Sequence, residues 1–393
     1  MTVFVSYSKD IDRVSSLVQA LRRHGLRTWR DQDALEQGDA TETAIETELA
    51  SCATAMVWLG GNTLDSGFVC KIELPMIFDN HTTRGLRIVP LFVDVDVATG
   101  IDQIRAATGR EIGTHNGYQF GPADSFGTDL LEVASREVKA TLRERAQAAN
   151  GRRPIIRCVT RSDAANCRDQ ADLNFDWIRE YPATGTMPDK TTVEDLRNAV
   201  HVSTQHLIAA FGPGTVDLHI TCHLHLGVAL GYELRRVTGL RPRVDVEGVW
   251  WKIDAAPALN DAERLIETTT NGPVDGTRTA IEISLNRDVG PLAAEYATSM
   301  TPYRRRIRLG PAGGPDQGSV NPENVNDWAE QAAAAIRRLK SLPGVEAVDV
   351  FMATPIGFAA ALGWRLNAIG GVSLFHPIGN AGPYELVWTI PDS

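Results

Sequence analysis

The sequence predicts an α/β protein with a parallel sheet in its N-terminal domain and a duplicated, Rossmann-like domain behind it. Two observations lead to this class. Residues 1–148 alternate short apolar runs with segments of helical periodicity. Two stretches of the second half repeat each other at a spacing of 132 residues. A length of 393 residues also fits two or three domains rather than one.

The first domain is predicted to be built from repeated strand–helix units. Residues 3–7 form a short apolar run typical of a buried strand, and residues 11–24 carry apolar side chains at the period of an amphipathic helix. Repeated units of this kind predict a parallel sheet with helices on both faces. The polar segment 149–154, with its glycine and proline, is the predicted linker. Further strands are expected over 26–29, 54–59 and 86–93, and further helices over 41–51, 68–78 and 132–149.

An internal repeat organises the second domain, predicted over 155–393. Residues 217–239 align with 349–371 without a gap, at six identical and five similar positions. Each copy has the pattern of a strand, a short loop and a helix that ends at a glycine, followed by another strand, which is a Rossmann-like unit. Open α/β sheets bind ligands beyond the carboxyl ends of their strands, so loops 221–225 and 353–357 are predicted to face one shared site. The two halves are expected near 155–309 and 325–393.

Composition excludes several classes of function. Lys and Arg number 39 against 49 Asp and Glu, and a net charge of −10 argues against a general basic surface that grips long nucleic acid. Five scattered cysteines and the absence of a leader pattern favour a cytoplasmic protein. The most apolar stretch, 353–375, is interrupted by Arg365 and Asn367, so no membrane segment is expected.

Three segments of the first domain resemble a known family. The runs FVSYS at 4–8, WRD and LEQG within 29–38, and SGFVCKIEL at 66–74 resemble the signature segments of the TIR domain. The resemblance implies a flavodoxin-like parallel sheet. It also implies that Glu73, in a Cys-x-x-Glu pattern with Cys70, is the catalytic residue for cleaving NAD. Val69 stands where the family usually has an aromatic residue, and 31–41 resembles its mobile loop.

The residues themselves fit this chemistry. Cys70 and Glu73 are three apart, which places them on one face near the start of a helix. Nicotinamide leaves a cationic pyridinium as a neutral base, so one carboxylate suffices to stabilise the oxocarbenium-like ribosyl group. The alternative for Glu73 is a solvated helix residue. A nucleotide is expected to dock at the ends of the first two strands, although core packing or helix capping are alternatives for the residues there, which are Tyr7, Ser8, Trp29 and Asp31.

The second domain resembles the SAVED domain, two fused CARF-like units that sense cyclic oligonucleotides in bacterial anti-phage signalling. The resemblance rests on the A-L-G-[YW]-x-L helix and on the strand-end loops of the repeat. A TIR domain followed by this sensor resembles the TIR-SAVED effectors of CBASS systems. That resemblance implies a cyclic oligoadenylate activator, cyclic tri-adenylate in the first place, and NAD+ as substrate with no cofactor. It also implies a homo-oligomer or filament held by TIR–TIR and SAVED–SAVED contacts, with no long nucleic acid and no membrane as partner.

Candidate sensor residues follow from position and residue type. Helix N-termini behind the two loops offer N–H groups to phosphates, a basic residue supplies a cation, and aromatic residues can stack on adenines. Core packing is the alternative for the aromatic residues. The run Arg304, Arg305, Arg306 and Arg308 could supply further cations or be a solvated edge strand. The candidates are Thr221, His223, His225, Trp250 with its neighbour Trp251, Asn286, Arg287, Thr354, Pro355 and Tyr384.

A metal site is not predicted. His219, Cys222, His223 and His225 are of ligand type. Their counterparts in the second copy are Phe351, Thr354, Pro355 and Gly357, of which none is a metal ligand of this kind.

Two other functions stay open at this stage. A TIR domain can act as a non-enzymatic scaffold assembled by the ligand, or as a cyclase that makes a cyclic ADP-ribose signal. Release of nicotinamide, with identification of the second product, distinguishes the three.

Overall fold

The structure is a computed structural model, and it describes residues 2–30, 41–60, 66–161, 170–181, 187–256, 264–299, 302–315, 320–379 and 382–391. The chain divides into two compact units. Unit 1 comprises Met1–Ala148 with Asp172–Phe175, and unit 2 comprises Ala149–Ala171 with Asp176–Ser393. None of the helices within the described residues is long and apolar enough to cross a bilayer.

Unit 1 is built on a five-stranded sheet in the order β2-β1-β3-β4-β5. All of its strand pairs are parallel, and the order 2-1-3-4-5 is that of flavodoxin-like folds, which confirms the predicted fold class. The first four strands are those expected, whereas the two-residue β5 is too short to leave a pattern in the sequence. The strands are β1 (Thr2–Ser6), β2 (Arg27–Trp29), β3 (Thr54–Leu59), β4 (Arg87–Phe92) and β5 (Tyr118–Gln119).

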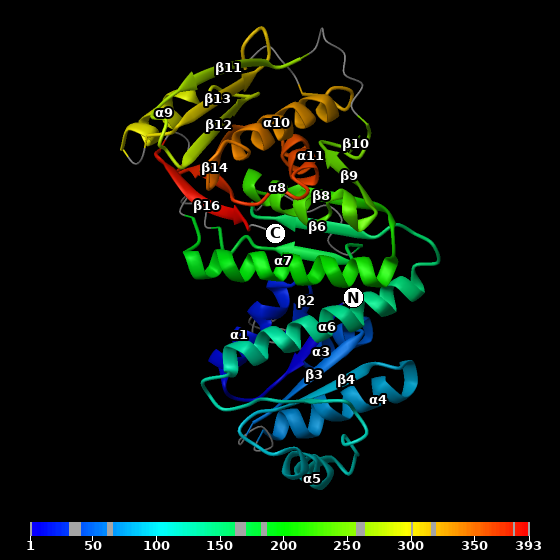
Figure 1. The fold of residues 1–393 in the computed structure, drawn as a ribbon. Helices are drawn as coiled ribbons and strands as arrows, with labels where there is room; N and C mark the ends of the chain where they lie inside the picture. Colours follow the sequence, from blue (N-terminus) through cyan, green and yellow to red (C-terminus); the bar gives the residue numbers. More distant parts are fainter. Residues whose placement is uncertain are drawn as a thin grey trace. The chain divides into compact units, whose positions relative to one another are not determined.

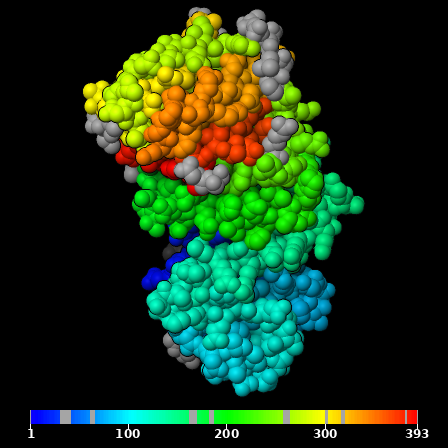
Figure 2. Space-filling view, viewed as in Figure 1, coloured from blue at the N-terminus to red at the C-terminus, as the bar shows by residue number. Residues whose placement is uncertain are grey.

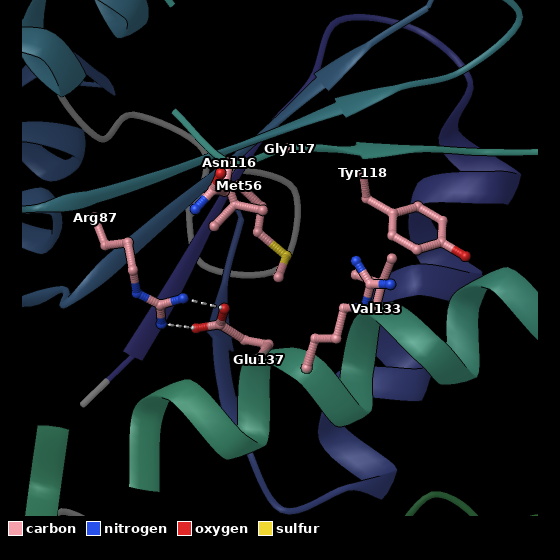
Figure 3. A pocket seen from close by; sticks show the side chains of 9 residues that line it. Met56, Arg87, Asn116, Gly117, Tyr118, Val133 and Glu137 are labelled. Carbon is pink, nitrogen blue, oxygen red and sulfur yellow. Dashed lines mark hydrogen bonds and ion pairs between the residues drawn. The ribbon is translucent and has the colours of Figure 1, made fainter. Parts of the chain in front are cut away.

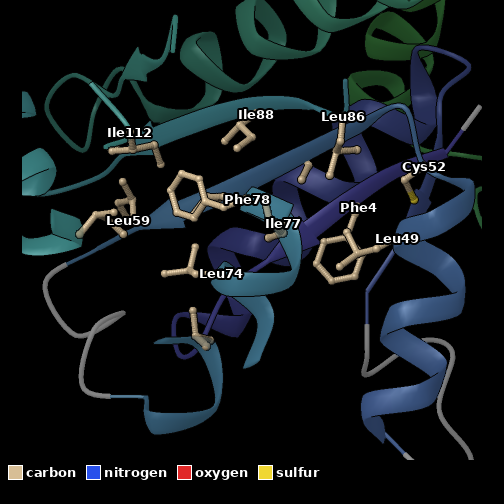
Figure 4. Close-up of a cluster of buried hydrophobic side chains, with 14 of the residues drawn as sticks. Phe4, Leu49, Cys52, Leu59, Leu74, Ile77, Phe78, Leu86, Ile88 and Ile112 are labelled. Atoms are coloured by element: carbon tan, nitrogen blue, oxygen red, sulfur yellow. The ribbon is translucent and has the colours of Figure 1, made fainter. Parts of the chain in front are cut away.

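Helices cover both faces of this sheet (Figure 1). On one face α1 packs against α6, and on the other α3 and α4 enclose an apolar core, to which Phe4, Leu49, Leu74 and Phe78 contribute (Figure 4). A π-helical turn, Val69–Glu73, leads directly into α4. The α-helices are α1 (Ile11–Arg23), α3 (Thr41–Ser51), α4 (Leu74–Arg84), α5 (Val97–Thr108) and α6 (Phe126–Ala148).

The strands of unit 2 form two sheets, and the first also includes β7, of which residues 173–175 are assigned to unit 1. The first has the order β10-β9-β8-β6-β7 and the second β11-β13-β12-β14-β15-β16. The strands of the first are β6 (Ile155–Val159), β7 (Leu173–Asp176), β8 (Gly214–Thr221), β9 (Leu240–Val246) and β10 (Val249–Lys252). Those of the second are β11 (Ile266–Asn271), β12 (Arg278–Ser284), β13 (Arg305–Gly310), β14 (Ala347–Ala353), β15 (Val372–Pro377) and β16 (Tyr384–Ile390).

Five helices accompany these sheets. Two of them, α8 and α11, are almost wholly buried and lie side by side (Figure 1), whereas α10 reaches the surface, in orange in Figure 2. The helices are α7 (Lys190–Phe211), α8 (Leu224–Glu233), α9 (Gly290–Ser299), α10 (Val325–Lys340) and α11 (Ile356–Arg365).

The repeat is visible in the elements themselves. Both α8 and α11 have ten residues and begin 132 positions apart, and β8 and β14 end at the corresponding residues Thr221 and Ala353. In each sheet the repeat strand has a parallel neighbour on either side, β6 and β9 for β8 and β12 and β15 for β14. An antiparallel strand, β10 or β16, follows in both. The duplicated Rossmann-like architecture is therefore confirmed.

The expected division of the repeat at residues 309 and 325 is wrong. Both β12 and β13 lie before that point in sequence, yet they belong to the second sheet with β14. The two sheets therefore divide between β10 and β11. The sequence repeat covers only the central strand and helix of each half, so it carries no information on which flanking strands join which sheet.

Glycines bring the two repeat helices into backbone contact. A Cβ atom at Gly231 of α8 would lie 2.1 Å from the carbonyl oxygen of Ala360, and one at Gly363 of α11 would lie 2.0 Å from that of Val228. Gly231 corresponds to Gly363 in the repeat, and Val228 corresponds to Ala360. Each contact is thus the counterpart of the other, as a pseudo-twofold axis between the helices requires.

Candidate functional site

A buried polar contact in unit 1 joins β1 to the π-helical turn. The Ser6 hydroxyl donates a hydrogen bond of 2.5 Å to Oε2 of Glu73. Both residues are buried, with exposed fractions of 1% and 4%. Ser6 was not among the predicted site residues, although a polar residue inside the apolar run of β1 was the signal that could have identified it.

The π-helical turn determines how Glu73 is presented. Ser66 begins the turn, since its hydroxyl accepts from the Val69 N–H and its carbonyl from the Cys70 N–H. Pro75, in the first turn of α4, has no N–H to donate, and in an α-helix its ring would clash with the Lys71 carbonyl. A wider turn relieves that conflict, and π-helical turns occur frequently at functional sites.

Cys70 and Glu73 consequently have different surroundings. Glu73 is buried against β1, whereas Cys70 is partly exposed. The prediction that Cys70 and Glu73 share one helix face assumed the i to i+4 hydrogen bonds of an α-helix. It does not apply to the i to i+5 pattern of the π-helical turn found here.

Three further candidates of unit 1 lie at the ends of β1 and β2. Tyr7 is buried and Ser8 partly exposed. Trp29 stacks on Phe4, with ring centroids 5.0 Å apart and an interplanar angle of 15°. Trp29 therefore has a packing role whether or not it also contacts a nucleotide. Asp31 lies outside the described residues, as does the predicted loop over 31–41 except for its last residue, Thr41.

A cavity in unit 1, of about 170 Å³, is lined by none of these residues (Figure 3). Arg87 of β4 donates two hydrogen bonds, of 2.9 and 2.6 Å, to the buried carboxylate of Glu137 on α6. Burial raises the pKa of Glu137, while Arg87 opposes that shift. Because the pair neutralises itself across the sheet and α6, it stabilises the fold and offers a ligand little unpaired charge.

Unit 2 contains a cavity of about 530 Å³ at the carboxyl ends of strands from both sheets. The paired loops of the repeat both reach it, through Thr221 at the end of β8 and Pro355 after β14, and Asn286 reaches it after β12. Neither α8 nor α11 has a side-chain cap at its N-terminus beside the cavity. The lining residues are Arg161, Ile220, Thr221, Cys222, Asp245, Val246, Glu247, Trp251, Asn286, Val320, Pro355 and Ile356.

Of the two adjacent tryptophans, Trp251 lines the cavity. Its ring lies close to Gly357, where a Cβ atom would be only 2.6 Å from Cε3, so the glycine lets the ring approach the backbone. Side chains alternate along β10, and Trp250 accordingly points elsewhere. It is 37% exposed, and the Arg243 guanidinium lies over its ring at 4.6 Å.

The two histidine candidates belong to an aromatic cluster. His223 stacks on Tyr181 at 4.7 Å and meets the His376 ring edge-on at 5.0 Å. The Tyr181 hydroxyl and His225 Nε2 share a hydrogen bond of 2.9 Å. Burial lowers the pKa of both His223 and His376 to about 4, and it lowers that of His225 well below its ordinary value, so all three are neutral at pH 7.

No group of three or more His, Cys, Asp and Glu residues in the described part of the chain is placed to hold a metal ion.

The remaining sensor candidates differ in accessibility. Tyr384 is 3% exposed and packs edge-on against Phe351 at 4.8 Å, the core arrangement that was the alternative for it. Thr354 is buried, and Arg287 is exposed next to Asn286.

Apart from Arg304, the arginine run lies on β13, which is not an edge strand because it pairs with β11 on one side and β12 on the other. Arg306 and Arg308 bind the buried carboxylate of Glu282 at 2.7 and 3.2 Å. These two cations are therefore already paired within the fold.

Family models match both units. The model of the TIR domain matches residues 3–116, and the model of the "SMODS-associated and fused to various effectors sensor domain", SAVED, matches residues 185–390. The second match covers more than half of the chain. No curated protein matches the sequence.

Solved structures with the same fold include two of the Acinetobacter baumannii Cap4 SAVED/CARF-domain containing receptor. One contains the cyclic trinucleotide 2′3′3′-cAAA; it has a TM-score of 0.52 and 14% identity, and the match covers 91% of this chain and 87% of that one. The other contains 3′3′3′-cAAA, with a TM-score of 0.52, 13% identity and coverages of 89% and 86%. At this identity the likeness concerns the fold alone. The chain belongs to the SAVED family and carries an N-terminal TIR domain in front of that sensor.

Proposed function

We propose that this protein is a ligand-activated NAD+ nucleosidase, in which a cyclic oligoadenylate binds the SAVED domain and the TIR domain then cleaves NAD+. The observation that carries the proposal is the buried Glu73 carboxylate, held by Ser6 in the π-helical turn of a TIR domain. The bacterial anti-phage role that the TIR-SAVED resemblance implies is part of the proposal.

The reaction needs little more than one placed carboxylate. The C1′–N bond of NAD+ breaks, its electron pair goes to the pyridinium nitrogen, and neutral nicotinamide leaves without a proton donor. Glu73 stabilises the positive charge that develops on the ribosyl group. Water adds at C1′ and loses a proton to solvent, which gives ADP-ribose.

The sensor cavity suits a cyclic oligonucleotide of modest size. Trp251 supplies a stacking surface for adenine, Asn286 can pair with a base edge, and Arg161 supplies a cation for phosphate. Both repeat loops contribute, which fits a ligand that itself has repeated parts. The Cap4 receptors of the same fold bind cyclic trinucleotides, and by analogy we propose cyclic tri-adenylate for this chain.

Activation requires that the ligand favour an active state over an inactive one. We propose that this state is a homo-oligomer in which neighbouring TIR domains complete each other's sites. A ligand that binds the assembled state more tightly shifts the equilibrium by its difference in affinity for the two states.

The test is nicotinamide release from NAD+ by the full chain, with cyclic di-, tri- and tetranucleotides as candidate activators. We expect activity with a cyclic oligoadenylate only, and a loss of at least a hundredfold in Glu73→Gln with ligand-induced assembly preserved. Glu46→Gln, an exposed carboxylate on α3, is the matched control and should retain full activity.

Other outcomes identify the alternatives. Assembly without nicotinamide release under any ligand would support the scaffold. A cyclised ADP-ribose product would support the cyclase. Full activity of Glu73→Gln would remove this residue from the mechanism.

A further inference from the structure

We propose that Ser6 is a positioning residue for the TIR reaction, which holds the Glu73 carboxylate ionised and in one orientation. The inference rests on the proposed function and goes beyond it, because it assigns a role to a residue outside the signature pair Cys70 and Glu73. The contact that carries it is the 2.5 Å hydrogen bond between two side chains that are 67 positions apart in the sequence.

Burial alone would work against a catalytic carboxylate. Glu73 is 4% exposed, and removal from water favours the neutral acid, which cannot stabilise a cationic transition state. A hydroxyl that donates to the ionised form favours that form. The distance of 2.5 Å between the Ser6 hydroxyl and Oε2 of Glu73 is typical of a hydrogen bond from a hydroxyl to a charged carboxylate. Such a bond is stronger than one between neutral groups.

Ser6 is well placed to fix the geometry of Glu73. It is the last residue of β1, the strand between β2 and β3, and it pairs in register with Val57. Strand β1 is paired on both sides and Ser6 lies in register with β3, whereas Glu73 sits in a π-helical turn, where the hydrogen-bonding pattern is irregular. The bond therefore ties the less regular element to the more regular one and fixes the plane of the carboxylate.

The sequence context supports a specific role for the hydroxyl. Every residue of β1 is buried, and the three before Ser6 are apolar. A hydroxyl in such a strand destabilises the fold unless it finds a partner. Its partner here is Glu73, the residue that the TIR resemblance implies is catalytic.

The experiment compares the full chain with Ser6→Ala, Ser6→Thr and Ser6→Cys in the ligand-activated nicotinamide-release assay over a range of pH. In Ser6→Ala we expect kcat to fall about tenfold, with KM changed less than threefold. We also expect the acid limb of the kcat profile to move about one pH unit upward, because the ionised carboxylate has lost its donor. Ser6→Thr, which keeps the hydroxyl, should restore most of both. Ser16→Ala is the matched control and should change neither, because Ser16 is a partly exposed serine on α1 whose hydroxyl donates to the Asp12 carbonyl.

The outcomes separate the two proposals. If the wild-type chain releases no nicotinamide with any ligand, both the proposed function and the role of Ser6 are overturned. If wild type is active and Glu73→Gln is not, but Ser6→Ala keeps its acid limb and its kcat within twofold, only the role of Ser6 is wrong. Should Ser6→Ala fail to fold, Ser6→Cys carries the test, since a thiol of similar size is a weak donor and should reproduce the shift of the acid limb.

Discussion

Substitution of Gly363 by alanine should loosen the sensor domain at the crossing of its two repeat helices. The added Cβ would lie 2.0 Å from the Val228 carbonyl oxygen and 2.9 Å from the Tyr232 backbone nitrogen. Contacts below 3.0 Å are essentially absent for real Cβ atoms, and all the atoms met are backbone, so α8 and α11 must separate by about 1 Å.

The energy of this change has two opposing parts. Overpacking of a close contact costs about 1–3 kcal/mol, and the loss of favourable packing around the separated helices adds to it. Alanine gains up to about 1 kcal/mol over glycine in helix propensity. We therefore expect unit 2 to lose about 2 kcal/mol of unfolding free energy.

Urea denaturation followed by tryptophan fluorescence measures this loss, because six of the eight tryptophans lie in unit 2. Gly127→Ala is the control, since that position of α6 has no atom within 4 Å of an added Cβ and should be stabilised slightly or unchanged. Gly363→Ala should also bind cyclic tri-adenylate more weakly, because the cavity of unit 2 lies beside the N-termini of α8 and α11. A Gly363→Ala chain as stable as wild type would refute the backbone contact.

Three other predictions test the sensor. Trp251→Leu should weaken the binding of cyclic tri-adenylate, measured by calorimetry, at least tenfold, because stacking on a base contributes about 1–3 kcal/mol. Trp250→Leu should change the affinity less than threefold. A larger effect of Trp250→Leu than of Trp251→Leu would contradict the cavity assignment. Glu282→Gln removes the carboxylate between two partly exposed arginines and should cost about 2 kcal/mol in urea denaturation, with no comparable effect expected for an exposed glutamate such as Glu385. The histidine cluster should make the stability of the fold depend on pH, because burial holds the pKa of His223 and His376 at about 4 against an ordinary value of 6.5. As the pH falls the unfolded chain takes up protons first, so stability that is present above pH 6.5 should be lost progressively toward pH 4. His376→Gln should reduce the slope of unfolding free energy against pH.

Much of the fold could be predicted because local patterns decide it. The strand 54–59 and the helix 41–51 were expected with the bounds observed, since apolar runs and helical periods are short-range signals. The repeat correctly identified the duplicated helices. It could not identify the partners of β12 and β13, because the sheet to which a strand belongs is a long-range property that no local pattern records.

The candidate site was less accessible to such reasoning. A period of two places adjacent residues on opposite faces of a strand, but it does not say which face meets the cavity, so Trp250 and Trp251 could not be distinguished. The arginines of β13 gave the pattern of a basic run, yet their counter-charge, Glu282, comes from a neighbouring strand. The bond from Ser6 to Glu73 depends on where β1 ends relative to a π-helical turn, which no propensity predicts.

The duplicated architecture also explains why the cavity is asymmetric although its helices are related by a pseudo-twofold axis. The contacts at Gly231 and Gly363 constrain the backbone and so remain equivalent in the two halves. The cavity residues around them have no such constraint and differ between the halves: the first sheet contributes Asp245 of β9 and Trp251 of β10, whereas Asn286 and Pro355 follow strands of the second. Symmetric helices fix the distance between the two walls, and asymmetric side chains can then distinguish one unit of a cyclic ligand from the next. We expect a sensor built this way to bind a ring as a whole and to select it by the differences between the two walls of the cavity.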